Sequence, residues 1–291
     1  MLYKFKKPIS SLLIFLGFII CLIKFFPWVQ KRLLYLPTKI DIIRLSNSQN
    51  CDFEMLNKIP NEKVSLIIGH AYGSPTANNN FLSPKLESFL IKNQYKIDTI
   101  FFTGDLFSIP TSKKWNKLYS LLDSKTKIYI SPGNHDVGVG NISRRKLFKE
   151  SMFFIKDYPY KFSIDNKDFI LEDSTVNHWN LSKESIKIIN EIPKQREVIL
   201  LRHNIPVREF ISLANSKEGY TKKLPTKTSL NKIFNRELTI ISGDGGAFKN
   251  LPRFFCNKFG KITFLINGIG DLKNDNILVL HKKKLFRFEL N

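Results

Sequence analysis

Three short apolar runs in the first half of the chain each end at a glycine, and two segments with helical periodicity separate them. In chain order the runs and the helical segments cover residues 64–69, 83–94, 97–104, 112–124 and 127–133. Alternation of strand and helix places successive strands in one parallel sheet, which the helices bury on its faces. This rhythm predicts an α/β domain of ordinary to large size.

The second half of the chain carries more strand patterns than helix patterns. A hairpin is predicted around residues 165–167, where a polar turn separates two alternating segments. One helix and then four further β segments follow, at residues 182–192, 196–204, 237–246, 260–271 and 276–290. We therefore expect the chain to open with parallel crossovers and to close with antiparallel pairing.

The amino end has a basic start and then an uncharged apolar run over residues 9–23, followed by Lys24 and an aromatic stretch that ends at Trp28. Counted through Trp28, this is about the 20 residues that a membrane-spanning helix needs. Lys24 can extend its charge to the membrane surface, and Trp28 suits the interface. A cleaved signal peptide is the alternative, but small residues are missing where the cleavage site would lie.

We predict three parts on this basis: a basic segment and transmembrane anchor over residues 1–28, a connector over 29–62 and a catalytic-type domain over 63–291. Positive charges flank the anchor in nearly equal number on both sides. The favoured arrangement has the amino end in the cytoplasm and the domain on the outer, periplasmic or extracellular side.

The chain is strongly basic, with 46 Lys and Arg against 25 Asp and Glu and a formal net charge of +21. Such a charge attracts polyanions. The basic residues are scattered rather than gathered in one stripe, so the pattern favours an anionic substrate or surface over nucleic acid, which stays open as a partner.

Three cysteines without CxxC spacing indicate neither a disulfide framework nor a thiolate zinc site. Cys21 lies inside the apolar run. Cys51 and Cys256 could pair only if the domain lies in an oxidising compartment.

Unusual polar residues follow the strand patterns at the point where each strand ends. They are His70 and Tyr72 in GHAYG, Asp105 in GDLF, Asn134, His135 and Asp136 in GNHD, His203 in LRHN, and Asp244 in SGDGG. In open α/β sheets, ligands bind beyond the carboxyl ends of the strands, where loops converge. Taken singly, each residue is as well explained by a turn or a helix cap. Five such sites in one chain indicate a common function.

Oxygen and imidazole donors in this mixture suit divalent ions such as Mn, Fe or Zn, and no thiolate competes for softer ions. A carboxylate can bridge two ions, as in two-metal phosphoesterases. The neighbouring glycines leave room for a phosphate close to the backbone.

The ordered set GDLF, GNHD and LRHN resembles the calcineurin-like metallophosphoesterases, whose pattern is D-x-H, G-D-x-x, G-N-H-[DE], an isolated His after a strand, and G-H-x-H. The resemblance extends from about residue 64 to the carboxyl end. It implies a two-sheet βαβ sandwich with a dinuclear metal centre, here preceded by one N-terminal transmembrane helix.

Carried over residue by residue, the resemblance implies that Asp105 is the bridging carboxylate and that Asn134 and His203 are ligands of the second metal. It implies that His135 contacts the phosphoryl group and protonates the leaving oxygen, with Asp136 orienting its imidazole. General acid catalysis of this kind contributes roughly 10²–10⁴-fold to the rate.

Two motifs depart from the family pattern. The first, D-x-H, is matched by His70 and Tyr72, so that an imidazole and a phenol stand where the family has a carboxylate and an imidazole. In the last, G-H-x-H, Asp244 replaces the first His as a second-metal ligand, and Gly246 supplies no donor for the first metal.

These losses fall on one side of the centre. The second site keeps Asp105, Asn134, His203 and Asp244, and the first keeps His70, Asp105 and, as a poorer donor, Tyr72. Replacement of an imidazole by Asp244 makes the second site harder and favours Mn or Mg over Zn. We expect one firm divalent metal site, with Mn favoured, and an altered second one.

The sequence thus predicts a membrane-anchored, metal-dependent phosphoesterase that hydrolyses a phosphate mono- or diester, with an envelope lipid or glycan precursor as a suitable substrate. A binding module that keeps one metal but no catalysis is the main alternative, since a fold does not guarantee its usual function. A nuclease is a further one. The loops that would set specificity carry no recognisable code.

Overall fold

The computed structural model describes residues 17–20, 49–138, 142–151, 153, 157–164, 166–177, 180–207, 209–210, 213, 236–246 and 254–290. The chain divides between Arg44 and Leu45 into two compact units. In the first unit only residues 17–20 are described, and they are helical. Most of the predicted membrane anchor therefore lies outside the described residues, and no helix within them has the length and hydropathy of a membrane span.

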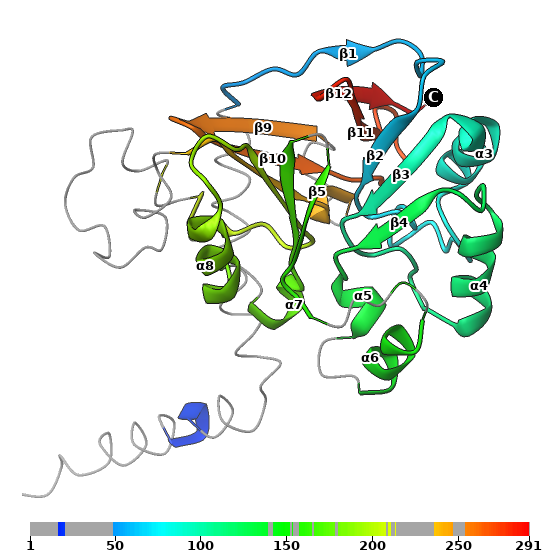
Figure 1. Ribbon diagram of the computed structural model, residues 1–291. Helices are drawn as coiled ribbons and strands as arrows, with labels where there is room; N and C mark the ends of the chain where they lie inside the picture. The colour runs from blue at the N-terminus through cyan, green and yellow to red at the C-terminus, as the bar shows by residue number, and fades with distance from the viewer. Residues whose placement is uncertain are drawn as a thin grey trace, which may run out of the picture. The chain divides into compact units, whose positions relative to one another are not determined.

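The second unit contains two six-stranded sheets (Figure 1). The first has the strand order β1-β12-β11-β2-β3-β4, and its central and edge strands β2, β3 and β4 run parallel, as the first half of the sequence predicts. Its strands are β1 (Met55–Leu56), β2 (Val64–Ile68), β3 (Ile97–Phe102), β4 (Lys127–Ile130), β11 (Asn276–His281) and β12 (Lys284–Glu289).

The second sheet has the order β5-β6-β7-β8-β10-β9. Its strands are β5 (Tyr160–Ile164), β6 (Lys167–Leu171), β7 (Val198–Arg202), β8 (Leu238–Ser242), β9 (Phe254–Phe259) and β10 (Ile262–Asn267). Pairing is parallel from β6 through β7 and β8 to β10, and antiparallel only where β5 and β9 join at the two edges. The expected antiparallel second half is therefore wrong for the centre of this sheet. A helix between β6 and β7 returns the chain to the same end of the sheet, and that connection makes the strands parallel.

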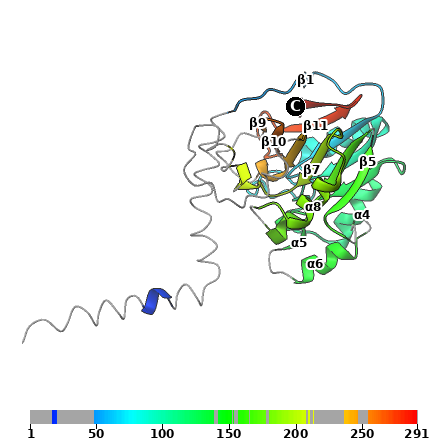
Figure 2. The same ribbon diagram turned by 60° about the vertical axis from the view of Figure 1, so that its left-hand side comes forward.

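Helices cover the outer faces of both sheets. Figure 1 shows α3 and α4 beside the first sheet and α8 beside the second, and both views place α5 and α6 at the same end of the strands (Figure 2). The helices are α3 (Pro84–Asn93), η1 (Gln94–Lys96), α4 (Ser112–Ser120), α5 (Asn134–Val137), α6 (Ile142–Lys149), α7 (Ser174–Asn177) and α8 (Lys183–Glu191). Hydroxyl caps start two of them, because Thr111 accepts from the N–H of Lys114 and Ser182 from that of Ser185.

The core follows from the alternation of side chains along β2 and β3. Ile67 and Phe101 point toward the second sheet and are fully buried there, where Phe101 stacks on Phe169 with ring centroids 5.0 Å apart. Their neighbours Ile68 and Phe102 point the other way, into the layer under the helices. Both faces of these strands are buried, as expected for parallel strands between two layers.

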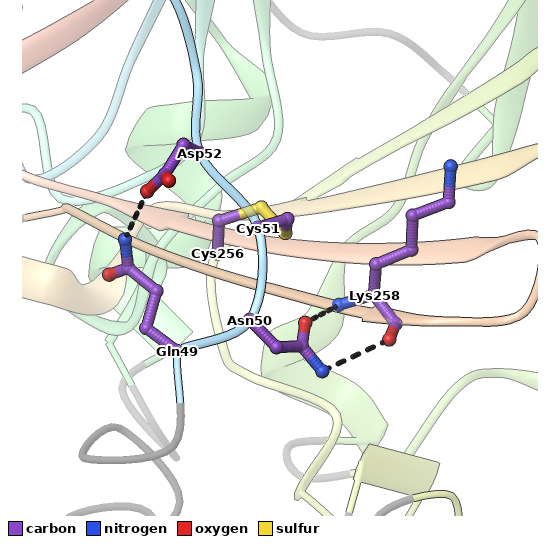
Figure 3. Close-up of a disulfide and its surroundings, with 6 residues drawn as sticks. All are labelled: Gln49, Asn50, Cys51, Asp52, Cys256 and Lys258. Carbon is purple, nitrogen blue, oxygen red and sulfur yellow. Dashed lines mark hydrogen bonds between the residues drawn. A yellow bond between two sulfur atoms is a disulfide. The ribbon is translucent and has the colours of Figure 1, made fainter.

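The segment before the domain is attached to both sheets. β1, inside the predicted connector, pairs with β12 of the first sheet. Cys51 forms a disulfide with Cys256 in β9 of the second sheet, with Cα atoms 5.4 Å apart, and the side chain of Asn50 bonds the backbone of Lys258 next to it (Figure 3). This part of the predicted connector is therefore built into the folded domain.

We expect loss of this disulfide to lower the free energy of unfolding by about 2–5 kcal/mol, because the bond joins residues 205 positions apart and restricts the unfolded chain. Urea denaturation of Cys51→Ser and Cys256→Ser should show this loss. Reductant should lower the urea midpoint of the wild type to that of the two variants, whereas Cys21→Ser should keep the wild-type midpoint. A wild-type midpoint that does not change when reductant is added would contradict the prediction.

Candidate metal centre

The carboxyl ends of strands from both sheets bring the sequence-predicted residues together. His70 and Tyr72 follow β2, Asp105 follows β3, Asn134 begins α5 after β4, His203 follows β7, and Asp244 begins η3 (Asp244–Gly246) after β8. Backbone hydrogen bonds join neighbouring loops, since the N–H groups of His70 and Tyr72 donate to the carbonyl oxygens of Gly104 and Asp105. All these residues except the half-buried Asn134 are buried.

The imidazole of His203 lies at the centre of the group and is fully buried. Its Nδ1 lies 3.1 Å from the carbonyl oxygen of Thr103. Its Nε2 faces three oxygens, at 3.0 Å from Oδ1 of Asn134, 3.4 Å from Oδ2 of Asp105 and 3.6 Å from Oδ1 of Asp244. A carbonyl at Nδ1 keeps a proton there and leaves Nε2 free to bind a metal.

His70 is arranged in the same way on the other side of Asp105. Its Nδ1 lies 3.2 Å from the carbonyl oxygen of Ile269, and its buried Nε2 has no hydrogen-bond partner among the described residues. That Nε2 lies 3.6 Å from Oδ2 of Asp105. His70, Asp105 and Asp244 each offer one ligand atom, all within 4.8 Å of one another.

These residues fit a divalent cation. The unpartnered Nε2 of His70, the Nε2 of His203 and the oxygens that face it are all electron-pair donors, and donors brought together in a buried space need a proton or a cation between them. Two imidazoles with carboxylate and amide oxygens form a donor set suited to Mn, Fe or Zn. Oδ2 of Asp105 lies within 3.6 Å of Nε2 of both imidazoles.

Burial and mutual charge shift the pKa values of the group in opposite directions. Burial lowers the pKa of His70 to about 4, so its imidazole is neutral. Burial raises the pKa of Asp244 to about 7, with Asp105 adding to the shift. Burial alone would lower the pKa of His203, but the carboxylates of Asp105 and Asp244 raise it. Burial likewise opposes the ionised form of Asp105, yet the imidazoles of His203 and His70 lower its pKa overall.

His135 lies at the half-buried rim of the group, but Asp136 does not orient its imidazole as expected. The carbonyl oxygen of Ser108 lies 3.0 Å from Nδ1 of His135 and holds the ring. The carboxylate of Asp136 accepts instead from the N–H groups of Asp105, Leu106 and Gly133, at 2.7, 2.9 and 2.9 Å. Asp136 therefore positions the Asp105 loop, because a buried carboxylate takes the nearest backbone donors.

Two ligand candidates have unusual backbone conformations. His70 and Asp105 have φ angles of 50° and 56°, in the left-handed region that costs a residue other than glycine about 1–3 kcal/mol. Gly104, with φ 88°, precedes Asp105, and a methyl group there would lie 2.6 Å from Nδ1 of His203. At Gly104 the backbone lies so close to the His203 side chain that only a residue without a Cβ atom fits, which explains why a glycine precedes Asp105.

Two supporting groups were not predicted from the sequence. Asp271 accepts from the N–H of Ser74, Nδ2 of Asn79 and Oγ of Ser83, and so holds the loop after Tyr72. Asp271 and its three partners all lie in loops, where sequence patterns do not indicate which residues pair.

Arg202, the last residue of β7, is fully buried and braces the next residue, His203. It pairs with Glu172 at 3.1 Å and donates to the carbonyl oxygens of Asn204 and Asn180. The sequence did contain a signal for this supporting role, because an arginine ends an otherwise apolar strand pattern one residue before a candidate ligand.

Metal affinity should depend on pH through Asp244 and His203. Below about pH 7 the Asp244 carboxyl is protonated in the absence of metal, and Nε2 of His203 also gains a proton because its pKa is raised. Metal binding displaces both protons. Mn²⁺ affinity should therefore rise with pH by about tenfold per unit below about pH 7 through Asp244, and by about a further tenfold per unit below the raised pKa of His203.

Calorimetric titration in buffers of different ionisation enthalpy counts the protons released. Asp244→Asn should bind Mn²⁺ more weakly and release one proton fewer below about pH 7. Affinity that does not change across this range would contradict the expectation.

Comparison with known proteins shows the family of the chain. A profile of the calcineurin-like phosphoesterase family (Metallophos) matches residues 70–243, more than half of the chain. No curated protein sequence matches the chain.

Among solved structures, the chain is similar to the purple acid phosphatase PPD1 of yellow lupin (Lupinus luteus), with a TM-score of 0.47, 13% identity and coverage of 78% of this chain. It spans about half of that protein, 53% of its length. The phosphopantetheinyl hydrolase PptH of Mycobacterium tuberculosis gives a TM-score of 0.42 at 10% identity, covering 72% of this chain and 91% of that one. Vps29 of Entamoeba histolytica, as a single mutant, gives 0.33 at 12% identity, covering 78% and 99%. By the family match, the chain belongs to the calcineurin-like phosphoesterases.

Proposed function

We propose that the chain is a metal-dependent phosphoesterase that hydrolyses a phosphate mono- or diester. The observation that carries the proposal is the convergence of Asp105, Asn134, His203 and Asp244 on one buried position, with His135 beside them. A divalent ion bound there supplies Lewis-acid polarisation of a phosphoryl oxygen and lowers the pKa of water.

The chain's own residues would hold the ion and move the proton. Asp105, Asn134, His203 and Asp244 are the proposed ligands, and His70 adds its free Nε2 from the opposite side of Asp105. His135 is the proposed general acid. With Nδ1 held by the carbonyl oxygen of Ser108, its imidazolium form presents the Nε2 proton to the leaving oxygen.

The same proposal places the domain on the outer side of a membrane, attached by the apolar segment over residues 9–28. The disulfide between Cys51 and Cys256 supports an oxidising compartment, because such bonds are rare in the cytosol. A basic domain in that setting would suit an envelope lipid or glycan precursor, since both classes carry phosphate esters.

The test is hydrolysis by the full chain, purified in neutral detergent and loaded with Mn²⁺. It should cleave p-nitrophenyl phosphate, bis(p-nitrophenyl) phosphate or both, and the two esters separate monoesterase from diesterase activity. The proposal would be contradicted if protein with its metal bound cleaved neither ester and no member of a panel of lipid-linked and glycan phosphates. The chain would then be better explained as a binding module without catalysis.

A further inference from the structure

The hydroxyl of Tyr72 is a buried polar group without a partner. The side chain is 1% exposed, and no described residue forms a hydrogen bond with the hydroxyl. Buried hydroxyls are nearly always bonded, because an unsatisfied one costs about 1–3 kcal/mol of desolvation. A phenylalanine would fill the same volume without that cost. None of the described residues satisfies the hydroxyl, so a bound ligand can supply its partner.

The ring of Tyr72 is held beside two residues of the candidate metal centre. The Tyr72 ring packs between the rings of His70 and His135, with centroid distances of 4.5 and 5.2 Å. Its backbone is fixed on both sides, since its N–H donates to the carbonyl oxygen of Asp105 and its own carbonyl accepts from Asn79. The Tyr72 ring thus packs against both a candidate metal ligand and the candidate acid.

The chemistry of a phenol decides what the Tyr72 side chain can bind. An ordinary tyrosine has a pKa of about 10, so its hydroxyl carries a proton at neutral pH. A protonated phenol is a poor metal ligand and a good hydrogen-bond donor. His70, Asp105 and Asp244 already form a ligand group without it. The missing partner is an acceptor oxygen.

We propose that the Tyr72 hydroxyl donates a hydrogen bond to a phosphoryl oxygen of the substrate, as a catalytic residue rather than as a metal ligand. The inference rests on the proposed function for the nature of that oxygen. The bond would be stronger to a phosphoryl oxygen as negative charge develops on it in the transition state, because hydrogen bonds to charged acceptors are about twice as strong as neutral ones.

The test compares Tyr72→Phe with wild type for binding of inorganic phosphate, in the full chain loaded with Mn²⁺. Loss of one hydrogen bond to an anion should weaken phosphate binding about 10- to 100-fold in calorimetry. Metal content, measured by elemental analysis, should stay at the wild-type value. For an ester that the wild type cleaves, kcat/KM should fall over the same range.

Tyr129→Phe is the matched control, because Tyr129, on β4, also lies in a stack of aromatic rings, where its ring packs on Phe101 and Phe162. It should change neither phosphate binding nor metal content. Phosphate binding by Tyr72→Phe that equals the wild-type value would overturn the inference. So would loss of metal in that variant, or a visible charge-transfer band in the Fe(III)-loaded wild type, because both would show a coordinated phenolate.

The two proposals fail in different ways. A wild type that binds phosphate through Tyr72 but cleaves no ester refutes the phosphoesterase and keeps the Tyr72 contact. A wild type that cleaves esters while Tyr72→Phe behaves identically refutes the Tyr72 contact alone.

Discussion

Replacement of Asp105 by Ala is expected to remove the tightly bound metal and at least about 10³-fold of the phosphoesterase activity. Oδ2 of Asp105 lies 3.6 Å from Nε2 of His70 and 3.4 Å from Nε2 of His203, so this one carboxylate contacts both imidazoles. A divalent ion contributes several kcal/mol of transition-state stabilisation, and each 1.4 kcal/mol corresponds to about tenfold in rate.

Asp105→Asn should be less severe than Asp105→Ala. Its amide can keep the contact in which Oδ1 of Asp105 accepts from the N–H of His135, at 2.9 Å, but it lacks the charge. Metal content by elemental analysis and kcat with p-nitrophenyl phosphate measure both effects. Asp98→Asn, at an exposed position of β3, the strand that precedes Asp105, is the control and should match the wild type. Full metal content in Asp105→Ala would show that the ion is bound elsewhere.

Replacement of His135 by Ala should lower kcat about 10²–10⁴-fold while the metal stays bound. The imidazole is held by the Ser108 carbonyl and is not among the ligand atoms around His203, so its loss should not empty the site. The loss should be largest for an alkyl phosphate, whose poor leaving group needs a proton, and small for p-nitrophenyl phosphate.

That dependence on the leaving group separates an acid from a residue that only binds phosphate, since lost binding would reduce both rates equally. His281→Ala is the matched control, because His281 contacts Glu62, which precedes the amino end of β2, whereas His70 follows the carboxyl end of that strand. Equal losses for the two esters, or release of the metal, would exclude His135 as the general acid.

The local order of the first half could be predicted because strand and helix patterns alternate there. The convergence of His70, Asp105 and Asn134 could be predicted for the same reason, since the parallel strands β2, β3 and β4 end at one edge. His203 and Asp244 follow β7 and β8 of the second sheet, whose parallel pairing was not predicted, so the strand patterns alone did not place these two residues in the group.

The rest could not be predicted because it depends on pairing between distant segments. β9 was missed, since its pattern FFCNKF lies next to β10 and is stabilised by pairing with it. The parallel centre of the second sheet depends on connections rather than on strand patterns. The predicted role of Asp136 was wrong. Its place in the sequence beside His135 does not show that its carboxylate accepts from the backbone N–H groups of Asp105 and Leu106, which are 30 or more residues away in the sequence.

The disulfide has a topological consequence for the metal centre. Cys51 and Cys256 close a covalent ring, and every candidate ligand from His70 to Asp244 lies within it. A single backbone cleavage anywhere inside the ring leaves two pieces that stay covalently joined. If a protease cut the chain once between His203 and Asp244, the piece with Asp105 and His203 would stay covalently joined to the piece with Asp244 through the disulfide.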